Sequence, residues 1–238
     1  MLWYKVWLET QSRFLISLSA AVALCSFMVY HGDQDAMPYT TLVYYYSVLH
    51  GGHALLCMIW VMAVTLLTMG GLLREKALGT APFTLALPVS RARLMAVRVS
   101  MVLGEAMALV IVPWAAMFLV GLVAGKTHSI QQATFHMALL AGGGMVLFGT
   151  ALLTSSLVEG EYTAPVVTFS VVLGVSSVLS GSSLHVYSPM EFITGAAYLD
   201  RHTALLAGPI PWLRIAANIL LGALLVALAA KSVQARDF

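Results

Sequence analysis

Long, continuous runs of apolar residues dominate the chain. A helix needs about 20 mostly apolar residues to cross a hydrocarbon core of about 30 Å. Because the runs do not alternate with polar positions, they favour transmembrane helices over the strands of a barrel. The pattern predicts an all-α polytopic membrane protein, a single transmembrane domain over residues 1–238 with six transmembrane helices, at roughly Phe14–Tyr30, Ala54–Leu73, Ser100–Gly125, Thr134–Val158, Ala164–Ser180 and Ile215–Ala230.

The residues before the first run have a different pattern. Aromatic and charged side chains are interleaved over residues 1–13, where Trp3, Tyr4 and Trp7 accompany Lys5. Such a mixture suits a helix that lies in the headgroup region of a membrane. We expect an N-terminal interfacial helix over 1–13. The alternative is that these residues lengthen the first span.

Composition supports the membrane assignment. Apolar residues make up 60% of the chain and charged residues 9%, whereas soluble domains are roughly 25% charged. This excludes a soluble enzyme, a disordered tail and a nucleic-acid-binding domain, and a net charge of +2 does not suggest a nucleic acid partner. Cys25 and Cys57 both lie in apolar runs, so neither a disulfide framework nor a cysteine metal cluster is indicated.

The Lys and Arg residues gather in alternate connecting segments. Five of the 12 lie between Arg74 and Arg98, whereas the outer segment from His31 to His53 contains no Lys or Arg. Basic residues collect on the cytoplasmic side of short loops. The distribution predicts a multi-pass protein of the plasma (inner) membrane with both termini cytoplasmic, which places nine of the 12 basic residues inside the cell.

The segment between the second and third spans is the most unusual part of the sequence. It reads Arg-Glu-Lys-Ala-Leu-Gly-Thr from Arg74 and continues to Leu-Ala-Leu-Pro-Val-Ser-Arg, which ends at Arg91. Pro88 disfavours helix at the preceding residue, and Ser90 is suited to cap the next helix. We expect a short amphipathic helix at the cytoplasmic surface, where a soluble partner could push it and tilt both attached spans.

These motifs resemble the cytoplasmic loop of ABC-2-type ABC transporter permeases. The resemblance extends over most of the chain, since an N-terminal interfacial helix, six spans, a long outer segment before the last span and the ending Ala-Arg-Asp-Phe at residue 238 are similar to that family. It implies that 74–98 is a cytoplasmic coupling loop that docks on an ABC ATPase subunit. The coupling residues would be Glu75, Gly79, Thr80, Leu87, Pro88, Ser90 and Arg91.

The resemblance also implies the partners and the cofactors. Two permease chains, expected as a homodimer in the lipid bilayer, would work with two ATPase chains, and ATP and Mg would bind the ATPase and not this chain. Gly121–Thr127 has three residues between its glycines where a phosphate loop needs four, so we reject it as a nucleotide site. A second cytoplasmic contact would involve Glu159 and Glu161; the alternative is a solvated turn.

The function predicted is that of a permease subunit of an ABC exporter, with no catalytic site of its own. Few polar groups lie in the spans, which favours a hydrophobic or amphipathic substrate. Two alternatives stay open. One is a membrane anchor or sensor subunit that does not transport, and the other is a secondary transporter, which the scarcity of charged or broken helices near the midplane disfavours.

Glu105 is the one carboxylate well inside a predicted span. It lies seven residues after Arg98, about two helical turns further on and on a similar face. Acids inside a membrane mark functional sites by default, so Glu105 could line a pathway or bind a proton. The alternative is a structural acid that snorkels to the interface or pairs with a cation.

Three further features favour packing or shape over chemistry. His50 and His53, three residues apart, lack the further ligands that a metal site would need, so no metal is expected. Pro113 and Trp114 predict a kink in the third span, and Gly142–Gly144 predicts close approach of another helix. Residues 188–211 contain two short apolar pieces around a polar turn, which predicts an outer re-entrant hairpin; an ordinary surface loop is the alternative.

Overall fold

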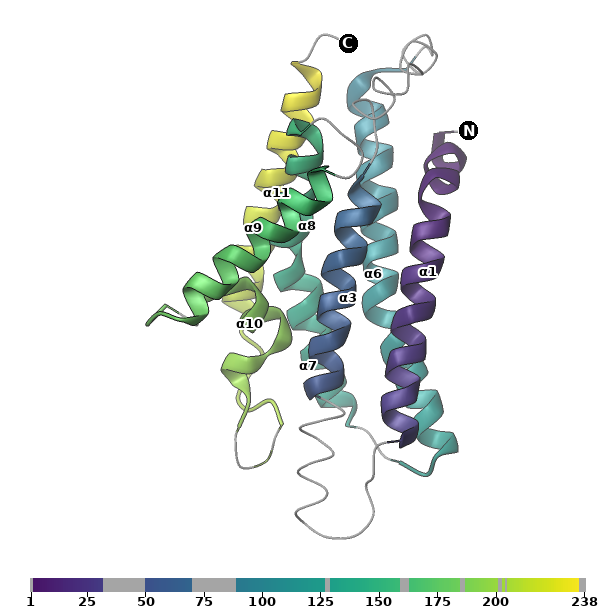
Figure 1. The fold of residues 1–238 in the computed structure, drawn as a ribbon, viewed down its shortest axis with the longest axis vertical. Coiled ribbons are helices and arrows are strands. Elements are labelled where there is room, and N and C mark those ends of the chain that lie inside the picture. Colours follow the sequence, from purple (N-terminus) through teal and green to yellow (C-terminus); the bar gives the residue numbers. More distant parts are fainter. Residues whose placement is uncertain are drawn as a thin grey trace.

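The computed structural model describes residues 2–31, 50–69, 89–126, 129–158, 163–184, 187–200, 203 and 205–235. Regular structure in these ranges is helical, apart from one isolated antiparallel bridge between Leu199 and Leu206. The elements, shown in Figure 1, are α1 (Leu2–His31), α3 (Gly52–Thr68), α6 (Arg91–Val123), α7 (Ile130–Ala138), the π-helical η2 (Leu139–Gly143), α8 (Gly144–Leu157), α9 (Thr163–Ser180), α10 (Pro189–Thr194), the 3₁₀-helical η4 (Ala196–Tyr198) and α11 (Trp212–Gln234). The all-α prediction is confirmed.

Five helices are long and apolar enough to cross a bilayer. They are α1, α6, the continuous helix formed by α7, η2 and α8, then α9 and α11. Each contains or closely matches one of the predicted spans, which agrees with a multi-pass membrane protein. The remaining predicted span corresponds to α3, an apolar helix of 17 residues.

The helices form an elongated bundle in which α1, α3 and α6 lie side by side (Figure 1). α11 packs along α8, and α9 diverges from the bundle toward its Ser180 end. The start of α1 and the end of α11 lie at the same end of the bundle. At the opposite end, the Lys126 ammonium donates to the carbonyls of Val29 (2.7 Å) and Tyr30 (3.0 Å), which ties the end of α6 to the last turn of α1.

The separate helix expected over residues 1–13 is not present. Residues 2–31 form the single helix α1, which contains neither Pro nor Gly to interrupt its hydrogen bonds. Thr10 is accommodated because its hydroxyl can donate to the Val6 carbonyl one turn earlier, at 3.1 Å. At 1.5 Å per residue α1 is about 45 Å long, more than a hydrocarbon core of about 30 Å requires.

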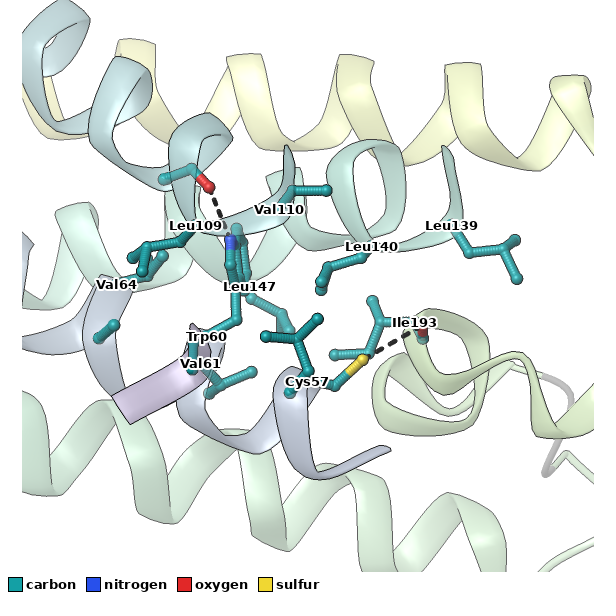
Figure 2. Packing of buried hydrophobic residues seen from close by; sticks show 14 of the residues in the cluster. Cys57, Trp60, Val61, Val64, Leu109, Val110, Leu139, Leu140, Leu147 and Ile193 are labelled. Carbon is teal, nitrogen blue, oxygen red and sulfur yellow. Dashed lines mark hydrogen bonds between the residues drawn. The ribbon is translucent and has the colours of Figure 1, made fainter. Parts of the chain in front are cut away.

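The core of the bundle is built around α3. Trp60 is 1% exposed, and its indole N–H donates to the Ala106 carbonyl of α6 at 2.9 Å (Figure 2). Gly144 of α8 faces this ring, because a Cβ built on Gly144 would lie 2.5 Å from Trp60 Cη2. Gly149 and Gly222 similarly bring α8 and α11 together, since a Cβ on Gly149 would lie 2.7 Å from the Gly222 carbonyl oxygen. Small residues thus set the helix spacing, as expected for the fourth span.

The chain between α9 and α11 forms a short, capped element. The Ser188 hydroxyl accepts from the Glu191 N–H at the start of α10, and Gly195 ends that helix with a φ of 77°. α10 packs against η2, α9 and α3, and Ile193 is fully buried there. The bridge between Leu199 and Leu206 closes a tight turn after η4. The segment 188–211 is therefore folded against the bundle.

Candidate functional site

A buried polar network joins three helices at the end of the bundle where both chain ends lie. α1 contributes Glu9, Thr10 and Arg13, which fall on adjacent turns of one face. α6 contributes Arg98 and Glu105, whose spacing of seven residues places both toward α1. The third partner is the C-terminal end of α3. Polar groups at this depth of a largely apolar bundle are the strongest candidates for function.

Glu105 is 4% exposed and interacts with α1 through one of its two oxygens. The Thr10 hydroxyl donates to Glu105 Oε1 at 2.5 Å. The second oxygen, Oε2, is buried and has no hydrogen-bond partner among the residues that the structure describes. A buried carboxyl oxygen without a partner is costly, so the site holds a polar atom whose full satisfaction requires a further group.

Arg98 connects the same face of α6 to both neighbouring helices. Its Nη1 lies 3.1 Å from Glu9 Oε2, and its Nη2 donates to the Met69 carbonyl at 2.5 Å. The side chain of Arg98 is 8% exposed and that of Glu9 30% exposed, so the ion pair is partly shielded from solvent. The planar guanidinium can make both contacts at once because its donors point in fixed directions.

Arg13 reinforces the attachment of α3. Its Nη1 donates to the Leu66 carbonyl at 3.0 Å and lies 3.4 Å from the Met69 carbonyl oxygen. Carbonyls in the last turn of a helix lack partners in their own helix and form the negative end of its dipole. Arg13 and Arg98 therefore both hold the end of α3, directly before residues 70–88.

Two of the predicted coupling residues lie in the described chain. Ser90 caps α6 as expected, because its hydroxyl accepts from the Arg93 N–H at 3.3 Å. α6 begins at Arg91, so the last part of the segment expected to be a loop, residues 91–98, is helical. The N-cap explains this difference, since it starts the helix before the apolar run begins.

The other predicted contact residues lie outside the described residues. They are Glu75, Gly79, Thr80, Leu87 and Pro88 of the coupling segment, and Glu159 and Glu161 of the second cytoplasmic contact.

A second polar arrangement, which the sequence did not indicate, docks α10 on the bundle. The Ile193 carbonyl accepts from His53 Nε2 at 3.0 Å and from Cys57 Sγ at 3.4 Å (Figure 2 shows the contact of Cys57). The Gln132 side chain makes two bonds to Leu206, one from Nε2 to its carbonyl (3.0 Å) and one from its N–H to Oε1 (2.9 Å). The only sequence signal was the i, i+4 spacing of His53 and Cys57 on α3.

The histidines of this region serve packing and hydrogen bonding. Within the part of the chain that the structure describes, no group of three or more His, Cys, Asp or Glu side chains is arranged to hold a metal ion. Pro113 lies inside α6, which continues without interruption to Val123, and Trp114 beside it is buried.

Comparisons of the chain with protein-family models, with curated proteins and with solved structures give no match.

Proposed function

We propose that this chain is the membrane subunit of an ATP-driven transporter of the ABC-2 permease type. The observation that carries the proposal is the position of the network around Arg98. The motif over 74–91 connects α3 to α6, and Arg98 links the last carbonyl of α3 with α1 at the point where that connection begins. A force on the motif would therefore reach three helices together.

Six spans with both termini cytoplasmic are part of the proposal. α3 has 17 residues, or about 25 Å of helix, which lies at the short end of the range for a membrane span. Its central position and buried side chains reduce the length of lipid-facing surface that it must provide. The two chain ends share one end of the bundle (Figure 1), which fits an even number of spans. The concentration of Lys and Arg supports the cytoplasmic side of the plasma membrane for that end.

The mechanism has three steps. ATP draws two partner ATPase subunits together, and these displace the coupling segment 74–98 of each of two permease chains. Arg98 and Arg13 transmit the displacement because they hold the end of α3 through charged hydrogen bonds, which are strong where water is excluded. The two bundles then alternate the exposure of a pathway between them. Residues 188–211, folded as α10 and the turn after it, would cover the outer end as a re-entrant element.

The cargo that fits this bundle is hydrophobic or amphipathic. The exposed side chains of α9 and α11 are mostly apolar, such as Val178 and Leu220. A sugar or an ion would require polar groups along its route. The direction proposed is export.

The coupling proposal is tested by ATP hydrolysis in a reconstituted complex. The full chain is co-purified with the ATPase encoded beside it and placed in proteoliposomes. Glu75→Ala and Arg91→Ala are expected to lower transport-coupled hydrolysis several-fold, while membrane insertion and yield stay unchanged. Arg93→Ala is the matched control, because Arg93 has the same charge, lies two residues further on and is exposed. Unchanged coupling in the Glu75 and Arg91 variants overturns the proposal.

The same proteoliposomes separate the other functions. A secondary transporter would move an amphipathic dye under an ion gradient without ATP. A membrane anchor or sensor subunit would bind the ATPase and leave dye movement at the level of empty liposomes.

A further inference from the structure

Three aromatic rings from three helices meet near the start of α3, at the end of the bundle away from Arg98. They are His53 of α3, Trp114 of α6 and His136 of α7. The ring centroids of His53 and His136 are 4.4 Å apart, and Trp114 lies 5.9 Å from the first and 5.5 Å from the second. All three side chains are at most 2% exposed.

The hydrogen bonds at the outer edges of the two imidazoles fix their tautomers. His53 Nε2 lies 3.0 Å from the Ile193 carbonyl oxygen, and His136 Nδ1 lies 2.8 Å from the Gln132 carbonyl oxygen. A carbonyl can only accept, so each of these nitrogens carries the proton. Both rings are neutral, because an unpaired charge at such depth would be very costly. His53 Nδ1 and His136 Nε2 are therefore lone-pair acceptors.

The remaining polar atoms of the cluster are all without partners. His53 Nδ1, His136 Nε2 and the Trp114 indole N–H are buried and form no hydrogen bond within the described ranges of the chain. The cluster thus offers two acceptors and one donor. Trp60 provides a contrast, since its equally buried N–H donates to the Ala106 carbonyl. Buried polar atoms without partners are rare and require a ligand.

We propose that His53, Trp114 and His136 form a binding site for a single water molecule. The water donates one hydrogen to His53 Nδ1 and the other to His136 Nε2, and it accepts from the Trp114 N–H. Buried waters typically make about three hydrogen bonds to groups of this kind. A metal cation is disfavoured because the indole N–H would face it, and an anion because two lone pairs would.

The surroundings give this water a structural role beyond the three rings. η2, one π-helical turn, begins at Leu139 directly after α7, and such turns are frequent at functional sites in membrane and soluble proteins alike. The water would bridge α3, α6 and α7. Through His53 it would also orient the nitrogen that binds Ile193 of α10. The site does not depend on the proposed transport function.

X-ray radiolytic footprinting of the full chain in nanodiscs tests the site, because radiolysis of a bound water oxidises the side chains next to it. Trp114 is expected to be oxidised several-fold faster than Trp60, and its oxygen label should exchange slowly after dilution into ¹⁸O water. His136→Phe should lower the rate at Trp114 to that of Trp60. Phe135→Leu, a change at the neighbouring buried position, should leave it unchanged. Equal rates at the two tryptophans in the unmodified protein overturn the proposal.

A second measurement uses the unmodified protein, so that it does not depend on the folding of any variant. Solid-state NMR with ¹⁵N-histidine records polarisation transfer from water protons to the ring nitrogens. Transfer to the unprotonated nitrogens of His53 and His136 supports the site. Transfer to neither nitrogen contradicts it.

Discussion

Thr10 on α1 donates a hydrogen bond of 2.5 Å to Oε1 of Glu105 on α6, although the two residues lie 95 positions apart in the chain. This contact provides a structural partner for an acid that the sequence alone left without one. It also fixes the rotation of α1 relative to α6, because the hydroxyl and the carboxyl can meet only at one register. The same register brings Glu9 to Arg98.

Replacing Thr10 by Val tests this contact. Val has nearly the same shape but no hydroxyl, so Oε1 of Glu105 would lose its donor in a buried place. We expect the free energy of unfolding to fall by about 1–3 kcal/mol, the usual cost of orphaning a buried polar group. Denaturant unfolding in mixed micelles measures it. Thr134→Val is the control, since the exposed Thr134 hydroxyl donates to a carbonyl of its own helix, that of Ile130.

Replacing Arg98 by Lys tests the attachment of α3. A lysine keeps the charge but cannot present two donors in the fixed geometry that serves Glu9 and the Met69 carbonyl. Amide hydrogen exchange in the last turn of α3 should therefore accelerate. Arg93→Lys is the matched control at an exposed position of the same helix. Equal protection of α3 in both variants would show that the Arg98 guanidinium does not hold that turn.

Gln132→Glu tests the docking of the segment after α10. The substitution removes the amide donor to the Leu206 carbonyl and keeps the size of the side chain. We expect faster amide exchange at Leu206 and increased proteolysis between Gly195 and Leu206. Gln131→Glu makes the same chemical change at the neighbouring exposed position and should leave both measurements unaltered.

Gly144→Ala tests the close packing of α8 on α3. The new Cβ would lie 2.5 Å from Trp60 Cη2, so the indole must shift. Overpacking of this kind typically costs about 1–3 kcal/mol of unfolding free energy. Gly174→Ala in α9 is the control, because nothing lies within 4 Å of its Cβ position. That variant should gain about 0.5–1 kcal/mol from the higher helix propensity of Ala. Similar midpoints for the two variants would contradict the packing argument.

The helices were predictable because each apolar run is long and local. The Ser90 cap also followed from local chemistry, and α6 began where that cap placed it. The division of α1 at residue 13 was wrong because aromatic and charged residues near the start of a helix have the same composition whether or not the helix continues into the apolar run. Hydrophobicity sets the boundary of a span but not the boundary of a helix.

The polar contacts were less predictable, because most of them join distant parts of the chain. The spacing of Arg98 and Glu105 placed both on one face of α6, but nothing in the sequence indicated that Glu9 and Thr10 would face them. The bonds between Gln132 and Leu206 depend on how the turn after η4 folds back, which no local pattern encodes. Register between helices is a tertiary property.

The contacts of Lys126 acquire a mechanical meaning beside those of Arg98. α1 and α6 are fastened near one end through Glu9 and Arg98, and at the other through Lys126 and the carbonyls of Val29 and Tyr30. Sliding one helix along the other would break both fastenings, so the pair can only turn or tilt as a unit. A push of a few ångströms at the Arg91 end would then appear as a swing at the far end. The two helices would act as a rigid lever.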